Sequence, residues 1–138
     1  MSEELSLMLQ EYAREPVNYF VMDDATISFT QPNNICGDSA TVYLKITDTH
    51  IEAASHAGEE ALHTSVAASL LMEELPGKDL QTVLTRWYTT MQAWWFSVSP
   101  RRKRAAVTAL LAARNAIHLY LQDGQVDTFE DLLESKTN

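Results

Sequence analysis

The feature that most constrains the fold is a run of three β-like segments between residues 25 and 57, with helix-forming sequence on both sides. ATISFTQ alternates Ile27 and Phe29 with hydroxyl side chains, the period-two pattern of a half-buried strand. ATVYLKITD is rich in β-branched and aromatic residues, and HIEAASHA is a weaker third candidate. TDTH between the last two is typical of a hairpin turn. The segments predict an antiparallel meander of three strands.

The rest of the chain has helical periodicity. Pro16 ends a first amphipathic segment, and Pro100 suits the start of a long one. Helices are expected at residues 2–15, 59–75, 80–96, 100–121 and 127–135. A helix, three strands and then helices predict an α+β two-layer domain, in which the helices pack on one face of a three-stranded antiparallel sheet. With no linker or repeat, residues 1–138 are expected to form a single domain.

Composition narrows the classes of function. The net charge of -9 argues against nucleic acid as the main partner. The acidic start does not resemble a secretory signal, and no apolar run approaches the roughly 20 residues that cross a bilayer. The single cysteine permits no intrachain disulfide, which fits a cytoplasmic protein. No nucleophile with a base and an orienting group stands out, so we do not expect an enzyme.

The lone cysteine lies in the sequence Cys36-Gly37-Asp38, just before the second predicted strand. Gly37 allows a backbone turn that other residues avoid, so that the side chains of Cys36 and Asp38 can point at one centre. A thiolate with a carboxylate suits zinc or ferrous iron. The alternatives are a small buried hydrophobic residue and a nucleophile.

The surrounding sequence resembles the scaffold family for iron–sulfur cluster assembly, of the IscU, SufU and NifU amino-terminal type. In that family an HYxxPxN segment leads to NPxCGDxxxxxLKI, then to a hairpin and a helix of small residues. The residues here that match these spacings are Pro16, Asn18, Cys36, Gly37, Asp38, Leu44 and Ile46. The resemblance extends through about residue 121 and implies the two-layer fold already predicted.

Relatives of this type use three cysteines and the aspartate to hold a [2Fe–2S] cluster, zinc, or sulfur in transit. Cys36 and Asp38 match the first cysteine and the aspartate. Glu60 stands where GxGCAxSxAS has the second cysteine, and Ala109 where the third precedes LLAWxAL. Two of the three cysteines are therefore missing, which makes a poor cluster site, because clusters are held mainly by thiolates.

Cys36, Asp38, Glu60 and His63 are the candidate ligands of a mononuclear site, since hard carboxylates suit ferrous iron. His63 would lie on roughly the same helix face as Glu60. The alternative is that Glu60 is a favourable acid in the first turn of a helix and His63 a solvated or core-edge residue. His56 is expected at the surface, at a strand end.

The basic run of residues 101–104 and three tryptophans need separate explanations. The run either pairs with the acidic surface or forms a docking patch like the basic segment before the family's third cysteine. The LPPVK segment of the IscU branch is absent. Trp87, Trp94 and Trp95 are expected mainly in the core. The adjacent pair cannot point the same way, so one exposed ring would favour a homo-oligomer or partner interface.

Two functions follow as expectations. The first is an iron–sulfur assembly scaffold or sulfur acceptor, using Cys36 and Asp38 with iron, zinc or a [2Fe–2S] cluster, and receiving sulfur from a cysteine desulfurase. The second is a relative without this chemistry, a binding or regulatory module for a desulfurase or another assembly protein. A site shared between subunits would rescue the first if one chain cannot hold a cluster.

Overall fold

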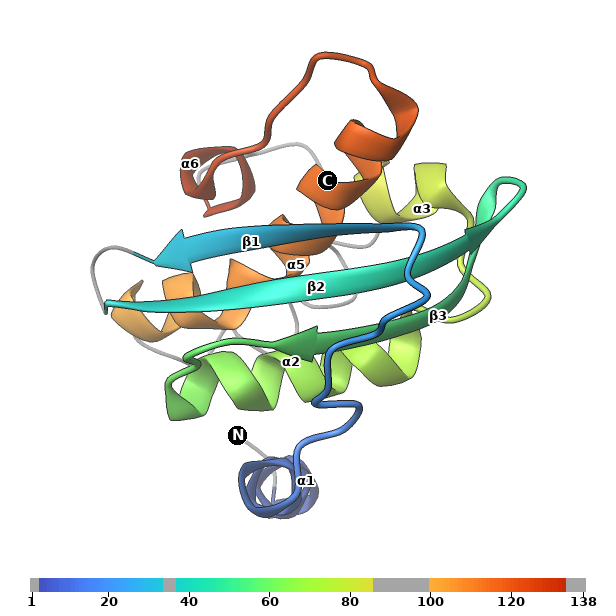
Figure 1. Cartoon of the computed structure of the whole chain (residues 1–138). Helices are drawn as coiled ribbons and strands as arrows, with labels where there is room; N and C mark the ends of the chain where they lie inside the picture. Colours follow the sequence, from blue (N-terminus) through green and yellow to red (C-terminus); the bar gives the residue numbers. More distant parts are fainter. Residues whose placement is uncertain (1–2, 34–36, 86–99, 134–138) are drawn as a thin grey trace.

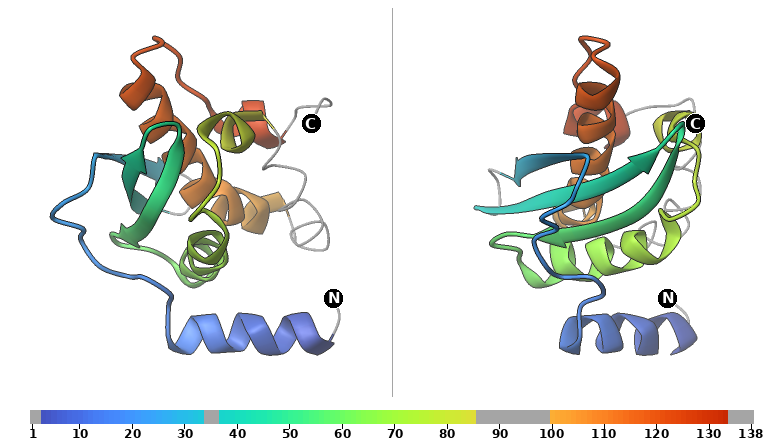
Figure 2. Two further views of the ribbon diagram at one scale, coloured as in Figure 1. Left: turned by 90° about the vertical axis from the view of Figure 1, so that its right-hand side faces the viewer. Right: turned by 45° about the vertical axis from the view of Figure 1, so that its right-hand side comes forward.

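The computed structural model describes residues 3–33, 37–85 and 100–133. Strands β1 (Ile27–Asn33), β2 (Asp38–Thr47) and β3 (His50–Ala57) form an antiparallel sheet in the order β1-β2-β3. Helices α2 (Leu62–Glu74) and α5 (Pro100–Leu121) cover one face of this sheet (Figures 1 and 2). The predicted two-layer α+β fold and the meander are both confirmed.

The alternation of buried and half-buried residues along β2 shows which face of the sheet packs against the core. The strand changes regularly between buried and half-buried residues, and its buried row faces the helices. That row comprises Asp38, Ala40, Val42, Leu44 and Ile46. Through the register of β1 on β2, the first four of these positions stand opposite Asn33, Gln31, Phe29 and Ile27, which continue the inward row.

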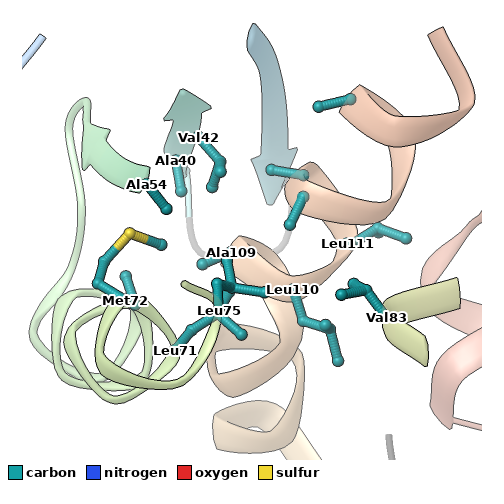
Figure 3. Close-up of a cluster of buried hydrophobic side chains, with 14 of the residues drawn as sticks. Ala40, Val42, Ala54, Leu71, Met72, Leu75, Val83, Ala109, Leu110 and Leu111 are labelled. Carbon is teal, nitrogen blue, oxygen red and sulfur yellow. The ribbon is translucent and has the colours of Figure 1, made fainter. Parts of the chain in front are cut away.

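The core lies between this inward row and the two long helices (Figure 3). Small residues on α2 and α5 let the helices approach the sheet closely, and larger ones fill the remaining space. Leu71, Met72 and Leu75 enter from α2 and its end, and Leu110 and Leu111 from α5. Each such side chain contributes about 1.5–3 kcal/mol by leaving water.

Helix α1 (Glu3–Arg14) packs on α2, away from the sheet (Figure 1). The Tyr12 hydroxyl donates a hydrogen bond of 2.6 Å to Glu73 of α2. Burial, together with this carboxylate, raises the pKa of Tyr12 to about 12. Between α1 and β1 the chain first runs beside β3 at the edge of the sheet, where the backbone oxygen of Asn18 accepts a hydrogen bond from the backbone nitrogen of His56. It then crosses the sheet face opposite the helices to reach β1 (Figure 2).

The carboxyl-terminal part adds short helices α3 (Leu80–Thr85) and α6 (Phe129–Leu133). Asp79 caps the start of α3, because its carboxylate accepts a hydrogen bond from the Gln81 backbone nitrogen. The expectations for the three tryptophans fall in residues 86–99, outside the described residues. Within the described ranges, none of the helices has the length and apolar character that crossing a membrane requires.

The basic run of residues 101–104 lies at the start of α5, directly after Pro100. The side chains of Arg101, Arg102 and Lys103 lie outside the described part, so the two explanations of the run stay predictions for them. Arg104 lies with its guanidinium carbon 4.1 Å from the centre of the Phe129 ring, a cation–π contact that holds α6 against α5.

At the other end of α5, the connection to α6 is tied onto the helix. His118 is buried, and its two ring nitrogens lie 2.7 Å from an Asp123 carboxylate oxygen and 3.2 Å from an Asp127 carboxylate oxygen. Asp127 also accepts from the Arg114 guanidinium at 2.7 Å. These contacts fix the start of α6 beside the last turns of α5.

Candidate functional site at the Cys-Gly-Asp turn

The turn between β1 and β2 is closed by its backbone. Asn33 and Asp38 are the last paired positions of the two strands. The Gly37 backbone nitrogen donates to the Asn33 carbonyl oxygen at 2.8 Å, and Gly37 has φ of 71°, which glycine adopts without strain. Cys36 falls in residues 34–36, outside the described residues, so its predicted role stays a prediction.

Asp38 joins the sheet to the start of α2. One carboxylate oxygen, Oδ2, accepts from the Ala61 backbone nitrogen at 3.1 Å and from the Thr64 hydroxyl at 2.6 Å. Ala61 is the residue before the first turn of α2, and its methyl side chain has no oxygen with which to cap the helix. Asp38 therefore supplies from the sheet the negative charge and the acceptor that this helix start needs.

The other carboxylate oxygen of Asp38, Oδ1, makes no such hydrogen bond to the start of α2. Asp38 is only 9% exposed, and its Oδ1 finds no hydrogen-bond partner in the part of the chain that the structure describes. Asn33, its neighbour across the strands, is 0% exposed, and neither its Oδ1 nor its Nδ2 has a partner within those residues. Three unsatisfied buried polar atoms thus lie at the two strand ends that flank the Cys36 turn, where each costs free energy unless a ligand or water satisfies it.

Glu60 lies close to this turn but has a partner of its own. Its carboxylate faces Nδ1 of His56 at 2.8 Å and 3.0 Å, and the two side chains are 2% and 0% exposed. The other ring nitrogen of His56 lies 3.0 Å from the Val17 carbonyl oxygen. Both ring nitrogens of His56 therefore lie within hydrogen-bond distance of an oxygen atom.

Two expectations about these residues are wrong. His56 is not a surface residue, because the register places it opposite Val42 on the inner face of the sheet. Glu60 is not a first-turn acid of α2 either, since that helix begins at Leu62. Sequence reasoning missed the pair, although the spacing of His56 two residues after the apolar Ala54 was a signal for an inward position.

The four predicted ligands can be placed only in part. His63 is half-buried in the first turn of α2, and Asp38 and Glu60 lie as described above. Among the described residues, no three or more histidine, cysteine or acidic side chains come together closely enough to hold a metal ion. Ala109, at the family's third cysteine position, is buried in the core beside α2 (Figure 3). The ligand set Cys36, Asp38, Glu60 and His63 stays a prediction.

Comparisons with known proteins identify the family of this chain. The family model for the NifU-like N terminal domain matches residues 6–126. The iron-sulfur cluster assembly scaffold protein IscU of Thermotoga maritima is 31% identical over 64 residues. That match spans 46% of this chain and 45% of that protein, so the chain covers about half the length of this curated relative.

Two solved structures share the fold. One is a NifU-like protein (N-terminal part) of Brucella abortus, with a TM-score of 0.67 and 13% identity, covering 85% of this chain and 94% of that one. The other is described as a putative scaffold protein for iron-sulfur cluster assembly in the SUF system of Fervidobacterium islandicum, with a TM-score of 0.58 and 15% identity, covering 86% and 94%. Since the family model matches most of its length, the chain belongs to the NifU-like N-terminal domain family.

Proposed function

We propose that this chain works in iron–sulfur cluster assembly, as a scaffold-like protein that binds iron or zinc, or accepts sulfur, at Cys36 with Asp38. Family membership supports the class of function. The single observation that carries the site is the buried Oδ1 of Asp38, which lacks a hydrogen-bond partner among the described residues although the carboxylate is held rigidly by its other oxygen.

The fixed carboxylate suits a metal ion. Oδ2 is engaged by Ala61 and Thr64 at the start of α2, so Asp38 does not need to reorder when a cation arrives. A cation at Oδ1 would satisfy the oxygen that is otherwise unpaired. Cys36, two residues earlier, would add a thiolate, and a thiolate with a carboxylate fits zinc or ferrous iron better than a cluster.

Accepting sulfur requires fewer of the family's three cysteines than holding a cluster does. The Cys36 thiolate would attack the terminal sulfur of a persulfide on a cysteine desulfurase. A new S–S bond forms at Cys36, the S–S bond on the donor breaks, and the donor cysteine leaves as a thiolate. The step needs one accessible thiolate and no oxidant, so it survives the loss of the other two cysteines.

Metal content and optical spectra of protein purified without oxygen test the proposal. Wild-type protein is compared with Cys36→Ser and Asp38→Ala. We expect near-stoichiometric iron or zinc, or thiolate-to-metal absorption bands, in the wild type and a loss of metal in both variants. Persulfide transfer is measured separately by mass spectrometry after mixing with a cysteine desulfurase and cysteine, and should disappear in Cys36→Ser only.

A matched control variant distinguishes the loss of the metal site from the loss of a hydrogen bond between Asp38 and the start of α2. Thr64→Val removes the hydroxyl that donates to Oδ2 but leaves the Asp38 carboxylate in place. It should lower stability while the protein retains its metal. Wild-type protein that holds no metal and accepts no sulfur would overturn the proposal.

A further inference from the structure

We infer that a groove beside the outer strand of the sheet binds a small carboxylic acid with an apolar body, and that Arg104 pairs with its carboxylate. The groove has a volume of about 360 Å³. Figure 1 shows β1 at the edge of the sheet and α6 beyond it. The lining comes from β1 (Phe29, Gln31 and Pro32), from α5 (Arg104) and from residues 126–130, which lead into α6. The inference goes beyond the proposed function, because it requires neither a metal nor Cys36.

Both sides of the groove are held in place by hydrogen bonds. On one side, β1 is paired with β2 along its length. On the other side, the Asn115 side chain accepts from the Asp127 backbone nitrogen at 2.7 Å and donates to the Asp127 carbonyl oxygen at 3.1 Å. Thr128 and Asp131 then cap α6 through reciprocal contacts between side chain and backbone. A groove with fixed sides costs little ordering free energy when a ligand binds.

Arg104 brings a positive charge to this groove. Its guanidinium carbon lies 4.1 Å from the centre of the Phe129 ring. In the described ranges no carboxylate forms an ion pair with the guanidinium, and its Nε is buried without a hydrogen-bond partner. Arg114 shows the contrast, since its Nε donates to Asp127 at 2.7 Å. The terminal N–H groups of Arg104 are therefore available to hold a carboxylate by two parallel hydrogen bonds.

The acidic residues that line the groove limit the charge of its ligand. Asp127 already accepts from Arg114, and a ring nitrogen of His118 lies 3.2 Å from the same carboxylate oxygen. Glu130, the other acid, is exposed. Because like charges repel, a dianion such as phosphate fits beside these carboxylates less well than a single carboxylate. The net charge of -9 also repels a strongly acidic protein, so the charges favour a small monoanion.

The rest of the groove suits an apolar group. Phe29 and Pro32 present carbon atoms from β1, and Val126 is 68% exposed on the opposite side. Burying such surface against a ligand is favourable because it removes the surface from water. The volume lies near the lower end of the range of roughly 300–1,000 Å³ that is usual for small-molecule pockets. A phenyl or short alkyl group attached to a carboxylate matches both the size and the chemistry of the groove.

The test is a titration followed by two-dimensional NMR, with 3-phenylpropanoate as the probe and 3-phenylpropanamide as its neutral counterpart. We expect saturable shift changes at the residues that line the groove. The acid should bind at least about tenfold more tightly than the amide, because only the acid forms charge-assisted hydrogen bonds with Arg104. Phenyl phosphate should bind more weakly than the acid, and tighter binding would overturn the assigned class of ligand. The absence of saturable changes with the acid would overturn the inference.

Two groove variants and a matched control locate the binding. Arg104→Met keeps the apolar stem beside Phe129 and removes the charge, so it should weaken acid binding at least about tenfold and leave amide binding unchanged. Val126→Glu adds a negative charge at an exposed position and should also weaken acid binding. This second variant decides the question if Arg104→Met fails to fold. Arg14→Met removes one positive charge from the exposed surface of α1 and should bind the acid as the wild type does.

The outcomes separate a specific groove from a general effect of charge. Equal weakening in Arg104→Met and Arg14→Met would show that net charge alone attracts the acid, which would overturn the inference. Unchanged acid affinity in either groove variant would overturn it as well. None of these measurements depends on metal content or on Cys36, so the inference and the proposed function can fail independently.

Discussion

His56 and Glu60 form an ion pair inside the protein, four residues apart across the connection from β3 to α2. Their side chains are 0% and 2% exposed, and His56 Nδ1 lies 2.8 Å from the nearer carboxylate oxygen. The Tyr19 ring packs edge-on against the imidazole, with centres 5.2 Å apart. The pair links the end of β3, the connection to α2 and the segment after α1.

Breaking this pair from either side should destabilise the fold. His56→Leu leaves a buried carboxylate unpaired, and Glu60→Leu leaves an unpaired imidazole, so each should cost about 3–5 kcal/mol. The double variant should lose much less than the sum, because no lone charge is left behind. Urea denaturation of all four proteins checks this. Single losses below about 1 kcal/mol would contradict the burial and pairing described here.

Much of the fold was predictable from local sequence. Alternation of Ile27 and Phe29 predicted the first strand, and Pro16 and Pro100 predicted helix boundaries, because these signals act within a few residues. Alternation along the second strand then carries Asp38 to the same face as the apolar Val42 and Leu44. Strand alternation and helix boundaries depend on local backbone geometry, which residues close in the sequence determine.

The site was predictable only in part. The motif identified Asp38, but its contacts with Ala61 and Thr64 span more than twenty positions and depend on how α2 meets the sheet. The spacing of His56 from Ala54 indicated its inward position, but a polar residue on a weak strand gives no local sign of a buried partner such as Glu60. The buried state of Asn33 likewise depends on strand pairing and on the helices packed above it.

The contact between Asp38 and Thr64 should contribute measurably to stability. Thr64→Val keeps the shape of the side chain but removes the hydroxyl that donates to Oδ2 at 2.6 Å. A lost hydrogen bond to a charged group costs about 1.5–3 kcal/mol. Thr64→Ser, which keeps the hydroxyl, should stay close to the wild type in urea denaturation. Equal loss in both variants would show that the methyl group, not the hydroxyl, matters.

Two glycines should respond differently to alanine. Gly37 has φ of 71° and open space around an added Cβ, so Gly37→Ala should cost only the backbone term of about 1–2 kcal/mol. Gly58 has φ of 128°, and an added Cβ would lie 3.1 Å from the Ser39 carbonyl oxygen. Gly58→Ala should therefore lower the thermal midpoint more than Gly37→Ala. Gly37→Asn should be milder still, because asparagine tolerates left-handed backbone. The reverse order would contradict this account.

Stability at high pH should depend on Tyr12. Desolvation and the Glu73 carboxylate raise the pKa of Tyr12 from 10.0 to about 12 in the folded protein. The unfolded chain therefore loses this proton first, so the contribution of Tyr12 to stability is complete below pH 10 and is lost as the pH rises through about 12. Tyr12→Phe cannot ionise, so the wild type should lose stability relative to this variant across that interval in urea denaturation. Parallel curves for the two proteins would mean that α1 does not hold Tyr12 against Glu73 in solution.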